Sequence, residues 1–379
     1  MHHSSTQPSA SLLEHFKSLE DPRAEHLLEH QLIDIIGLTI CAVICGADTW
    51  VDIEQYGRAK EDWLRGFLAL PKGIPSHDTI ARLFAALNPQ ALQECFLNWV
   101  KAVAQLSQGE VVAIDGKCVR HSYDTGRGKG AIHMVSAWAS QNRLVLAQVK
   151  VDEKSNEITA IPQLLKVLAL EGCIVTIDAM GAQTQITEQI IAAGGEYVLS
   201  LKANQGNLHE DAQQLFEWSR QIGFTDIPHE FHQTLDGGHG RIEIRRHWLL
   251  ERVEYLIDAE RWVGLKRLGV VESERRIDGQ PPTIEQRYYR VSLDGGVERF
   301  AQAVRSHWGI ENQVHWILDV AFDEDASRIR IDYAPENLSL VRHVALNLLH
   351  QETSAKVGIK AKRLKAGWDN DYLSRILTA

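Results

Sequence analysis

The chain has 379 residues, of which 44% are apolar, and a formal net charge of −10. That length suits two or three domains, and the acidic balance excludes a protein that coats nucleic acid by bulk positive charge. The five cysteines are scattered and form no CxxC pair, which excludes a disulfide framework or zinc ribbon and fits a reducing cytosol. Basic residues outnumber acidic ones only locally, by seven to three over residues 101–150 and by six to three from residue 351 onward.

Residues 1–106 are predicted to form a helical N-terminal domain for DNA binding or association. Apolar residues recur at helical spacing around Leu12–Leu19, Ile35–Ala47, Trp50–Leu68, Asp78–Leu87 and Pro89–Gln105. The most apolar of these segments has too few residues to span a bilayer, and the polar start resembles no signal peptide. We therefore expect a cytoplasmic protein with no membrane partner. The segment Asp78–Leu87 is a candidate DNA-recognition helix.

Residues 107–228 change to an α/β pattern. Strand-like runs are predicted at 110–114, 131–140, 144–151, 173–177 and 197–201, and helices at 159–170, 184–193 and 207–221. Three antiparallel strands followed by alternating helices and strands are typical of a ribonuclease H-like fold. We expect a catalytic domain of that class.

The remaining residues divide into three parts. Residues 229–295 predict a β-rich insertion, with strands at 241–250, 268–273 and 283–292. Residues 296–350 return to helical patterns at 297–318 and 335–350 and are expected to complete the catalytic domain. Residues 351–379 form a basic C-terminal segment.

Two aspartates stand out because each ends an apolar strand. Asp115 follows the run from Val111 to Ile114, and Asp178 follows the run from Cys173 to Ile177. Open α/β sheets carry their chemistry at strand ends, where an unpaired carboxylate would otherwise be costly. Glu311, on a later helix, is the third candidate. Three carboxylates of this kind suit Mg²⁺, and two ions would serve phosphodiester transfer, with Mn²⁺ as a substitute.

At this point the sequence resembles the bacterial insertion-sequence DDE transposases of the H-repeat-associated group over nearly its whole length. The segments that carry the resemblance are HQLIDIIGLTICAVICGADTWVDIEQYG around Gln31, GIPSHDTIARLF from Gly73, VVAIDGKCVRHS from Val111, DEKSNEITAIPQLL from Asp152, TIDAMG from Thr176, LKANQG from Leu201, HGRIEIRRH from His239 and HWGIENQVHWILDVAFDED from His307. The resemblance implies a ribonuclease H-like catalytic domain with an inserted β-domain, DNA as substrate, and Asp115, Asp178 and Glu311 as the catalytic acids.

The chain departs from the wider transposase class around the glutamate. Related transposases often carry Tyr, Arg and Lys at fixed offsets from it, where this chain has Val304, His307 and Leu318. The assignment of Glu311 rests on the HWGIEN segment, and Asp319 or Glu324 are alternative ligands. Because His307, Glu311 and His315 are spaced four apart on one helix face, a zinc site is a further alternative.

Residues near the acids and in the insertion are predicted to contact DNA. They are Lys117, Arg120, Arg127, Lys129, Lys202, Asn204, Gln205, His239, Arg241, Arg245, Trp262, His307 and Asn312. Trp248 and Trp262 have two interpretations, stacking on an unpaired base or burial in a core.

The sequence thus predicts a transposase that binds element ends as a homodimer or higher oligomer. It would cut double-stranded DNA at the terminal inverted repeats and join the 3′-hydroxyl to target DNA. Two alternatives stay open: a structure-specific nuclease on the same fold, and a catalytically silent DNA-binding protein derived from a transposase.

Overall fold

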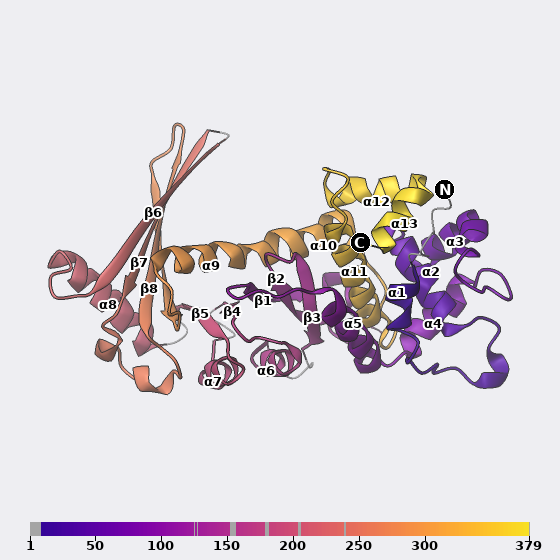
Figure 1. Cartoon of the computed structure of the whole chain (residues 1–379), viewed down its shortest axis with the longest axis horizontal. Coiled ribbons are helices and arrows are strands. Elements are labelled where there is room, and N and C mark those ends of the chain that lie inside the picture. Colours follow the sequence, from indigo (N-terminus) through magenta and orange to yellow (C-terminus); the bar gives the residue numbers. More distant parts are fainter. Residues whose placement is uncertain are drawn as a thin grey trace, which may run out of the picture.

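The computed structural model describes residues 9–124, 126, 128–151, 157–178, 182–203, 206–238 and 240–378. Figure 1 shows helices gathered at one end, a sheet with helices on both faces in the middle, and long strands at the other end. The architecture is mixed α/β with a helical N-terminal part, as the sequence predicts at this coarse level. No described helix is both long and apolar enough to cross a membrane.

The N-terminal helices begin where the sequence supplies capping side chains. Thr49, Ser76 and Asn88 each accept a backbone N–H at the start of a helix, which satisfies a donor that the helix leaves unpaired. The second helix is buried from Asp34 to Ile44, as the apolar segment predicts. The elements are α1 (Ser9–Glu14), the 3-10 turn η1 (Glu25–Leu27), α2 (Leu32–Ile44), α3 (Trp50–Leu64), α4 (His77–Ala86) and α5 (Pro89–Val103).

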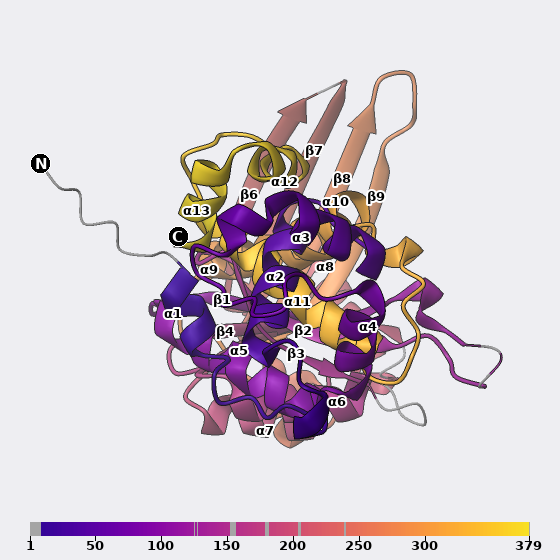
Figure 2. The same cartoon turned by 90° about the vertical axis from the view of Figure 1, so that its right-hand side faces the viewer.

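One C-terminal helix, α11 (Ala334–Gln351), forms the centre of this helical group. It packs against α2, α4 and α5, and all of its residues are buried except Glu336 and Gln351. Its Asn347 side chain pairs with both backbone groups of Val145 and so covers the edge of the sheet. Figure 2 shows α11 among the N-terminal helices, with α12 (Ile359–Trp368) and α13 (Asn370–Leu377) beside them. The basic C-terminal segment therefore contains two helices.

The central sheet has the strand order β3-β2-β1-β4-β5-β9-β8-β7-β6. Its first five strands are β1 (Val111–Cys118), β2 (His133–Ala139), β3 (Leu144–Lys150), β4 (Ile174–Ile177) and β5 (Glu196–Leu201). The first three are antiparallel, whereas β4 is parallel to both β1 and β5. The helices between them are α6 (Glu157–Val167), α7 (Thr184–Ala192) and α8 (Asn207–Gln221), and the 3-10 turn η2 (Arg120–Ser122) follows β1.

The β-rich stretch between residues 229 and 295 continues this same sheet. Its strand β9 (Thr283–Val291) pairs with β5, and β8 (Arg267–Ile277), β7 (Arg241–Leu250) and β6 (His229–Gly238) follow in antiparallel order. The 3-10 turns η5 (Val253–Tyr255) and η6 (Ala259–Arg261) connect β7 to β8. The far ends of these strands project from the molecule in Figure 1. The predicted domain boundaries stay predictions.

A single helical rod crosses the sheet and joins the two ends of the molecule (Figure 1). It consists of α9 (Val297–Ile310), the π-helical turn η7 (Glu311–His315) and α10 (Trp316–Ala321). The 3-10 turn η8 (Glu324–Ala326) then leads toward α11. In Figure 1 this rod lies on the opposite face of the sheet from α6 and α7, so the sheet is covered on both faces.

Candidate functional site

A cavity of about 200 Å³ lies where β1, β4 and the helical rod meet. Asp115, Asp178 and Glu311, the three acids singled out in the sequence, all line it. The other lining residues are Thr176, Ile177, Val198, Ser200, Lys202, Glu285, Arg287, Tyr289, Val304, His307 and Trp308. Side chains separated by as many as 196 positions are therefore brought to one place.

The strand register explains why the two aspartates are neighbours. Ile114 of β1 and Ile177 of β4 form the last register pair of two parallel strands, and Asp115 and Asp178 follow them. The pKa of Asp115 is raised to about 7, mainly by burial and in addition by the nearby carboxylates of Glu157, Glu311 and Asp178, although a hydrogen bond from the Gly116 backbone N–H acts to lower it. Among the described residues, the charged groups that shift the pKa of Asp115 are thus other carboxylates.

Asp178 has a cationic partner. The ammonium of Lys202, directly after β5, lies 2.9 Å from one carboxylate oxygen of Asp178 and 3.0 Å from the other. Both side chains are partly exposed, so this ion pair contributes little to stability. The ion pair matters because it places the Lys202 ammonium at the edge of the cavity.

Glu311 begins the π-helical turn between α9 and α10. Turns of this type are rare and often occur at functional sites, because they change the direction in which side chains leave a helix. His307, one turn earlier, is fixed by a 2.9 Å hydrogen bond between its Nδ1 and the Thr176 hydroxyl. Burial lowers the pKa of His307 to about 4, so its imidazole is neutral near pH 7.

The zinc alternative finds no support in the described part of the chain. His307 faces Thr176, whereas His315 Nδ1 lies 3.6 Å from Asp115 Oδ2. Within the residues that the structure describes, no three His, Cys, Asp or Glu side chains form a group able to hold an ion on their own. A metal at the cavity would therefore need oxygen ligands from water or substrate as well as from protein.

The structure also brings Glu157, which the sequence analysis missed, next to Asp115. Glu157 is the first residue of α6, and its carboxylate accepts a 2.8 Å hydrogen bond from His133 Nε2. Its carboxylate occupies the space that a side chain on Gly116 would fill, since a Cβ there would lie 2.2 Å from Glu157 Oε1. The available signal was an acid two residues before the helix predicted over residues 159–170, together with a glycine directly after Asp115.

Lys117 is surrounded by three carboxylates, those of Asp319, Glu324 and Asp325, and we call these four residues the Lys117 cluster. Its ammonium is 2.6 Å from Asp319, 2.8 Å from Glu324 and 3.6 Å from Asp325. The side chain of Lys117 is only 11% exposed. Asp319 and Glu324, the alternative metal ligands, are thus bound to a lysine in this structure. Arg120, in contrast, is exposed and 3.3 Å from Asp325.

The other predicted DNA contacts are distributed over the molecule. Lys129 donates to the Asp332 carbonyl, and Asn312 donates to the Trp308 carbonyl. In the strand extension, Arg245 pairs with Asp236 and Glu243, and Arg241 lies 3.7 Å from Glu243. Arg127, Asn204, Gln205 and His239 lie outside the described residues.

The two tryptophans with alternative interpretations differ in burial. Trp248 is 7% exposed and packs on Phe216, so the core alternative is confirmed for it. Trp262 is half-buried, with the Arg290 guanidinium 3.7 Å from its ring centroid. One face of Trp262 is therefore already covered by a cation.

Comparison with known proteins gives consistent matches over nearly the whole chain. Residues 106–348 match the Transposase DDE domain family and residues 13–100 the DDE_Tnp_1-associated family. The H repeat-associated putative transposase YhhI of Escherichia coli K12 is 42% identical over 97% of both chains. The putative transposase YncI of Escherichia coli O157:H7 is 41% identical over 97% of this chain and 95% of its own. A piggyBac transposase in a synaptic complex with hairpin DNA aligns with a TM-score of 0.41 and 10% identity, over 98% of this chain and 78% of that one.

Proposed function

The chain belongs to the transposases with a DDE domain, and we propose that it is a ribonuclease H-like enzyme that cleaves DNA at element ends and joins the freed 3′-hydroxyl to target DNA. The observation that carries this proposal is the cavity lined by Asp115, Asp178 and Glu311, which lies where the parallel pairing of β1 with β4 ends and the helical rod passes. We assign these three acids as the catalytic residues.

The donor set of the cavity fits a hard divalent cation. All three acids offer carboxylate oxygens, and among the described residues Asp115 is largely buried near the carboxylates of Glu157, Glu311 and Asp178, with the His315 imidazole 3.6 Å away. Mg²⁺ prefers such oxygens, and at phosphoryl-transfer sites it takes one or two carboxylates together with water and substrate phosphates. A bound pair of Mg²⁺ or Mn²⁺ ions would supply activation of the attacking oxygen and neutralisation of the leaving one.

The cations around the cavity are suited to hold the DNA backbone. Lys202 reaches Asp178 from the end of β5, and Arg287 of β9 lies over the Trp308 ring, 4.9 Å from its centroid. Both residues line the cavity. Phosphate contacts of this kind position a strand without reading its sequence, and positioning supplies a large part of the catalysis in phosphoryl transfer.

We retain the predicted contacts to double-stranded DNA as part of the proposal, except for Lys117. Arg120 is exposed and therefore available to a phosphate, whereas Lys117 already binds three carboxylates and is better assigned to holding η8 against β1. The site residues Lys202, His307 and Asn312 would act close to the scissile phosphate. Assembly of two or more copies on DNA ends is part of the same proposal.

Removal of divalent metal is expected to stop both reactions. The purified protein would be incubated with a duplex carrying the inverted repeats that flank its gene, and products would be resolved on a denaturing gel. Chelation by EDTA should abolish cleavage and joining, and Mg²⁺ or Mn²⁺ should restore them. A labelled strand linked to target plasmid identifies a transposase, whereas cleavage without any joined product identifies the nuclease alternative. Cleavage that persists in EDTA contradicts the proposed metal site.

Replacing Gly116 by alanine is expected to reduce cleavage about 10- to 100-fold, the usual loss when groups that support a metal site are displaced. The new Cβ would lie 2.2 Å from Glu157 Oε1 and 2.5 Å from His133 Nε2, so their hydrogen bond must break. Both atoms are the ends of side chains that can move, so the free energy of unfolding should fall by no more than about 1–3 kcal/mol.

The matched control for this substitution is Gly237→Ala, because a Cβ at Gly237 meets no atom within 4 Å. Cleavage rates and thermal unfolding would be measured for both variants. Wild-type cleavage by the Gly116→Ala variant would mean that the Glu157–His133 pair has no part in the site.

A further inference from the structure

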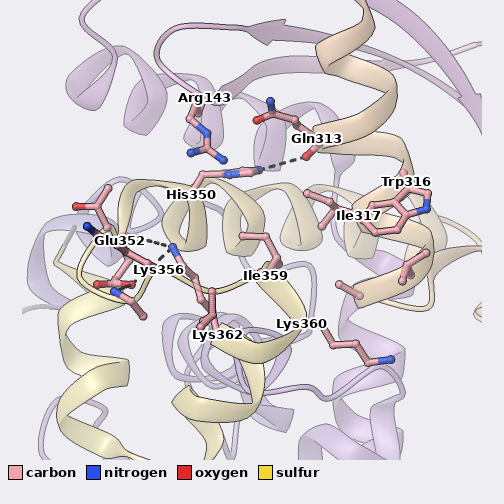
Figure 3. A pocket seen from close by; sticks show the side chains of 16 residues that line it. Arg143, Gln313, Trp316, Ile317, His350, Glu352, Lys356, Ile359, Lys360 and Lys362 are labelled. Atoms are coloured by element: carbon pink, nitrogen blue, oxygen red, sulfur yellow. Dashed lines mark hydrogen bonds and ion pairs between the residues drawn. The ribbon is translucent and has the colours of Figure 1, made fainter. Parts of the chain in front are cut away.

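A second cavity, of about 570 Å³, lies between the end of the helical rod and the segment from α11 to α12, and we call it the α10 groove. One wall is the end of the helical rod, with Gln313, Trp316, Ile317, Val320 and Ala321. The facing wall runs from the end of α11 into α12, with His350, Glu352, Thr353, Ala355, Lys356, Val357, Gly358, Ile359, Lys360 and Lys362 (Figure 3). Arg143, from the turn between β2 and β3, closes one end. Cavities of about 300–1,000 Å³ are those that hold small organic ligands.

The rod contributes exposed apolar side chains to the groove. Trp316 and Val320 lie on one helix face because they are four residues apart, and Ile317, three residues before Val320, is partly buried against the core. Trp316 is 60% exposed and Val320 is 47% exposed. Large apolar side chains that are exposed together mark interaction sites more often than isolated ones do. A flat aromatic face in such a place suits a planar ligand.

The groove is also positively charged, in a chain whose net charge is −10. Arg143, Lys356 and Lys360 line it, and within the part of the chain that the structure describes none of them has an ion-pair partner. Its one acid, Glu352, is already engaged by Tyr372, which donates a 2.6 Å hydrogen bond, and by Lys362 at 3.7 Å. The cations are thus left to neutralise a ligand, which must be anionic.

The base of the groove contains polar atoms as well. His350 Nε2 is 3.2 Å from the Gln313 carbonyl oxygen (Figure 3), and His350 itself is buried. Gln313 Oε1 and His350 Nδ1 have no hydrogen-bond partner among the described residues. Buried polar atoms without partners are costly, so a ligand with polar edges would be favoured here.

We propose that the α10 groove binds an unpaired stretch of a DNA strand, with one base against Trp316 and neighbouring phosphates on Arg143, Lys356 and Lys360. Only an unpaired base exposes the flat face that Trp316 can contact, since the bases of a duplex are stacked on one another. A peptide made of acidic residues alone would satisfy the cations but not the aromatic surface. The proposal rests on the proposed function, because strand cleavage is the reaction that frees a strand beside Glu311.

The test compares binding of a short fluorescein-labelled single strand and of its duplex to the full-length protein, by fluorescence anisotropy in EDTA. Loss of one base–aromatic contact should weaken single-strand binding by the Trp316→Ala variant about 5- to 100-fold, and Trp316→Phe should recover part of it. The matched control is Trp368→Ala, because Trp368 is 78% exposed on α12 but does not line the groove. Since Trp316 is exposed, its variants should keep the wild-type thermal unfolding.

The cations are tested by the dependence of binding on salt. The double variant Lys356→Gln with Lys360→Gln should reduce the slope of log affinity against log salt by about 1.4, as expected for two lost phosphate contacts to a single strand. The control pair Lys101→Gln with Lys166→Gln, also exposed lysines, should leave the slope unchanged. A strand containing 5-iododeoxyuridine should cross-link to the peptide that contains Trp316.

Several results would overturn the groove assignment. The first is that the Trp316→Ala variant binds the single strand as tightly as the wild-type protein does. The second is that the variant loses as much affinity for the duplex as for the single strand. The third is that polyglutamate displaces the labelled strand as effectively as an unlabelled single strand does. Because binding is measured without metal, it is independent of catalysis. A protein that binds the single strand through Trp316 but cleaves no DNA would retain the groove and lose the proposed function.

Discussion

Replacing Asp115 by asparagine is expected to reduce strand cleavage by at least about 100-fold and to leave binding of DNA ends nearly unchanged. Groups that merely support metal ligands cost about 10- to 100-fold when mutated, so a ligand itself should cost no less. Asparagine keeps the size of the side chain and removes its charge. Because the aspartate is buried among Glu157, Glu311 and Asp178, removing that charge should not destabilise the fold.

This expectation is checked by cleavage of a labelled duplex in Mg²⁺, together with a mobility-shift measurement of end binding and a thermal unfolding curve. The matched control is Asp62→Asn on α3, an exposed aspartate far along the chain from the cavity. Cleavage within a factor of about three of wild type would remove Asp115 from the catalytic site. Loss of end binding with loss of cleavage would instead assign Asp115 to DNA recognition.

Replacing Glu324 by glutamine is expected to lower the free energy of unfolding by about 3–5 kcal/mol, the usual cost of removing one partner from a buried ion pair. Glu324 is 1% exposed and lies between Lys117, at 2.8 Å, and Arg342, at 3.5 Å. Burial opposes its charge, yet Lys117 and Arg342 hold its pKa at about 2. The variant leaves a guanidinium in the interior without its carboxylate.

Urea denaturation at pH 7 measures this loss directly. Glu188→Gln serves as the control, because Glu188 is exposed on α7 and its change should stay within about 0.5 kcal/mol. A loss below about 1 kcal/mol for Glu324→Gln would show that Asp319 and Asp325 compensate fully for the missing charge. Such a result would contradict the central position we give Glu324 in the Lys117 cluster.

The elements that the sequence predicts well are those with strong local patterns. The apolar runs before Asp115 and Asp178 become β1 and β4, although β1 continues through Asp115 to Cys118 because it keeps pairing with β2. The helix predicted over residues 184–193 is found at Thr184–Ala192. The strand β6 was missed, because His229–Gly238 alternates only weakly and ends in two glycines. It becomes a strand by pairing with β7, where Leu235 is opposite Ile244. Pairing energy between strands is not visible in either strand alone.

In the candidate site, too, some features are visible in the local sequence and others arise only when distant segments pack together. Asp115, Asp178 and Glu311 line one cavity, and all three could be singled out from the sequence, two because they follow apolar runs and one because it lies in the HWGIEN segment. Their catalytic role stays a prediction. The π-helical turn at Glu311 interrupts a helical pattern that has no break in the sequence. Glu157 resembles any acid at a helix start until α6 packs beside Gly116.

What the chain determined by itself is therefore the kind of each segment and the chemistry of its side chains, because hydrogen bonding and apolar periodicity act over a few neighbouring residues. What only the folded molecule decided is which charges meet. Lys117 resembles a phosphate contact in the sequence, yet it binds carboxylates about 200 positions away. The α10 groove likewise combines Arg143, Trp316 and Lys356 from three separate segments. Electrostatic surroundings depend on distance in space and on burial, and both are set by packing between segments that are remote along the chain.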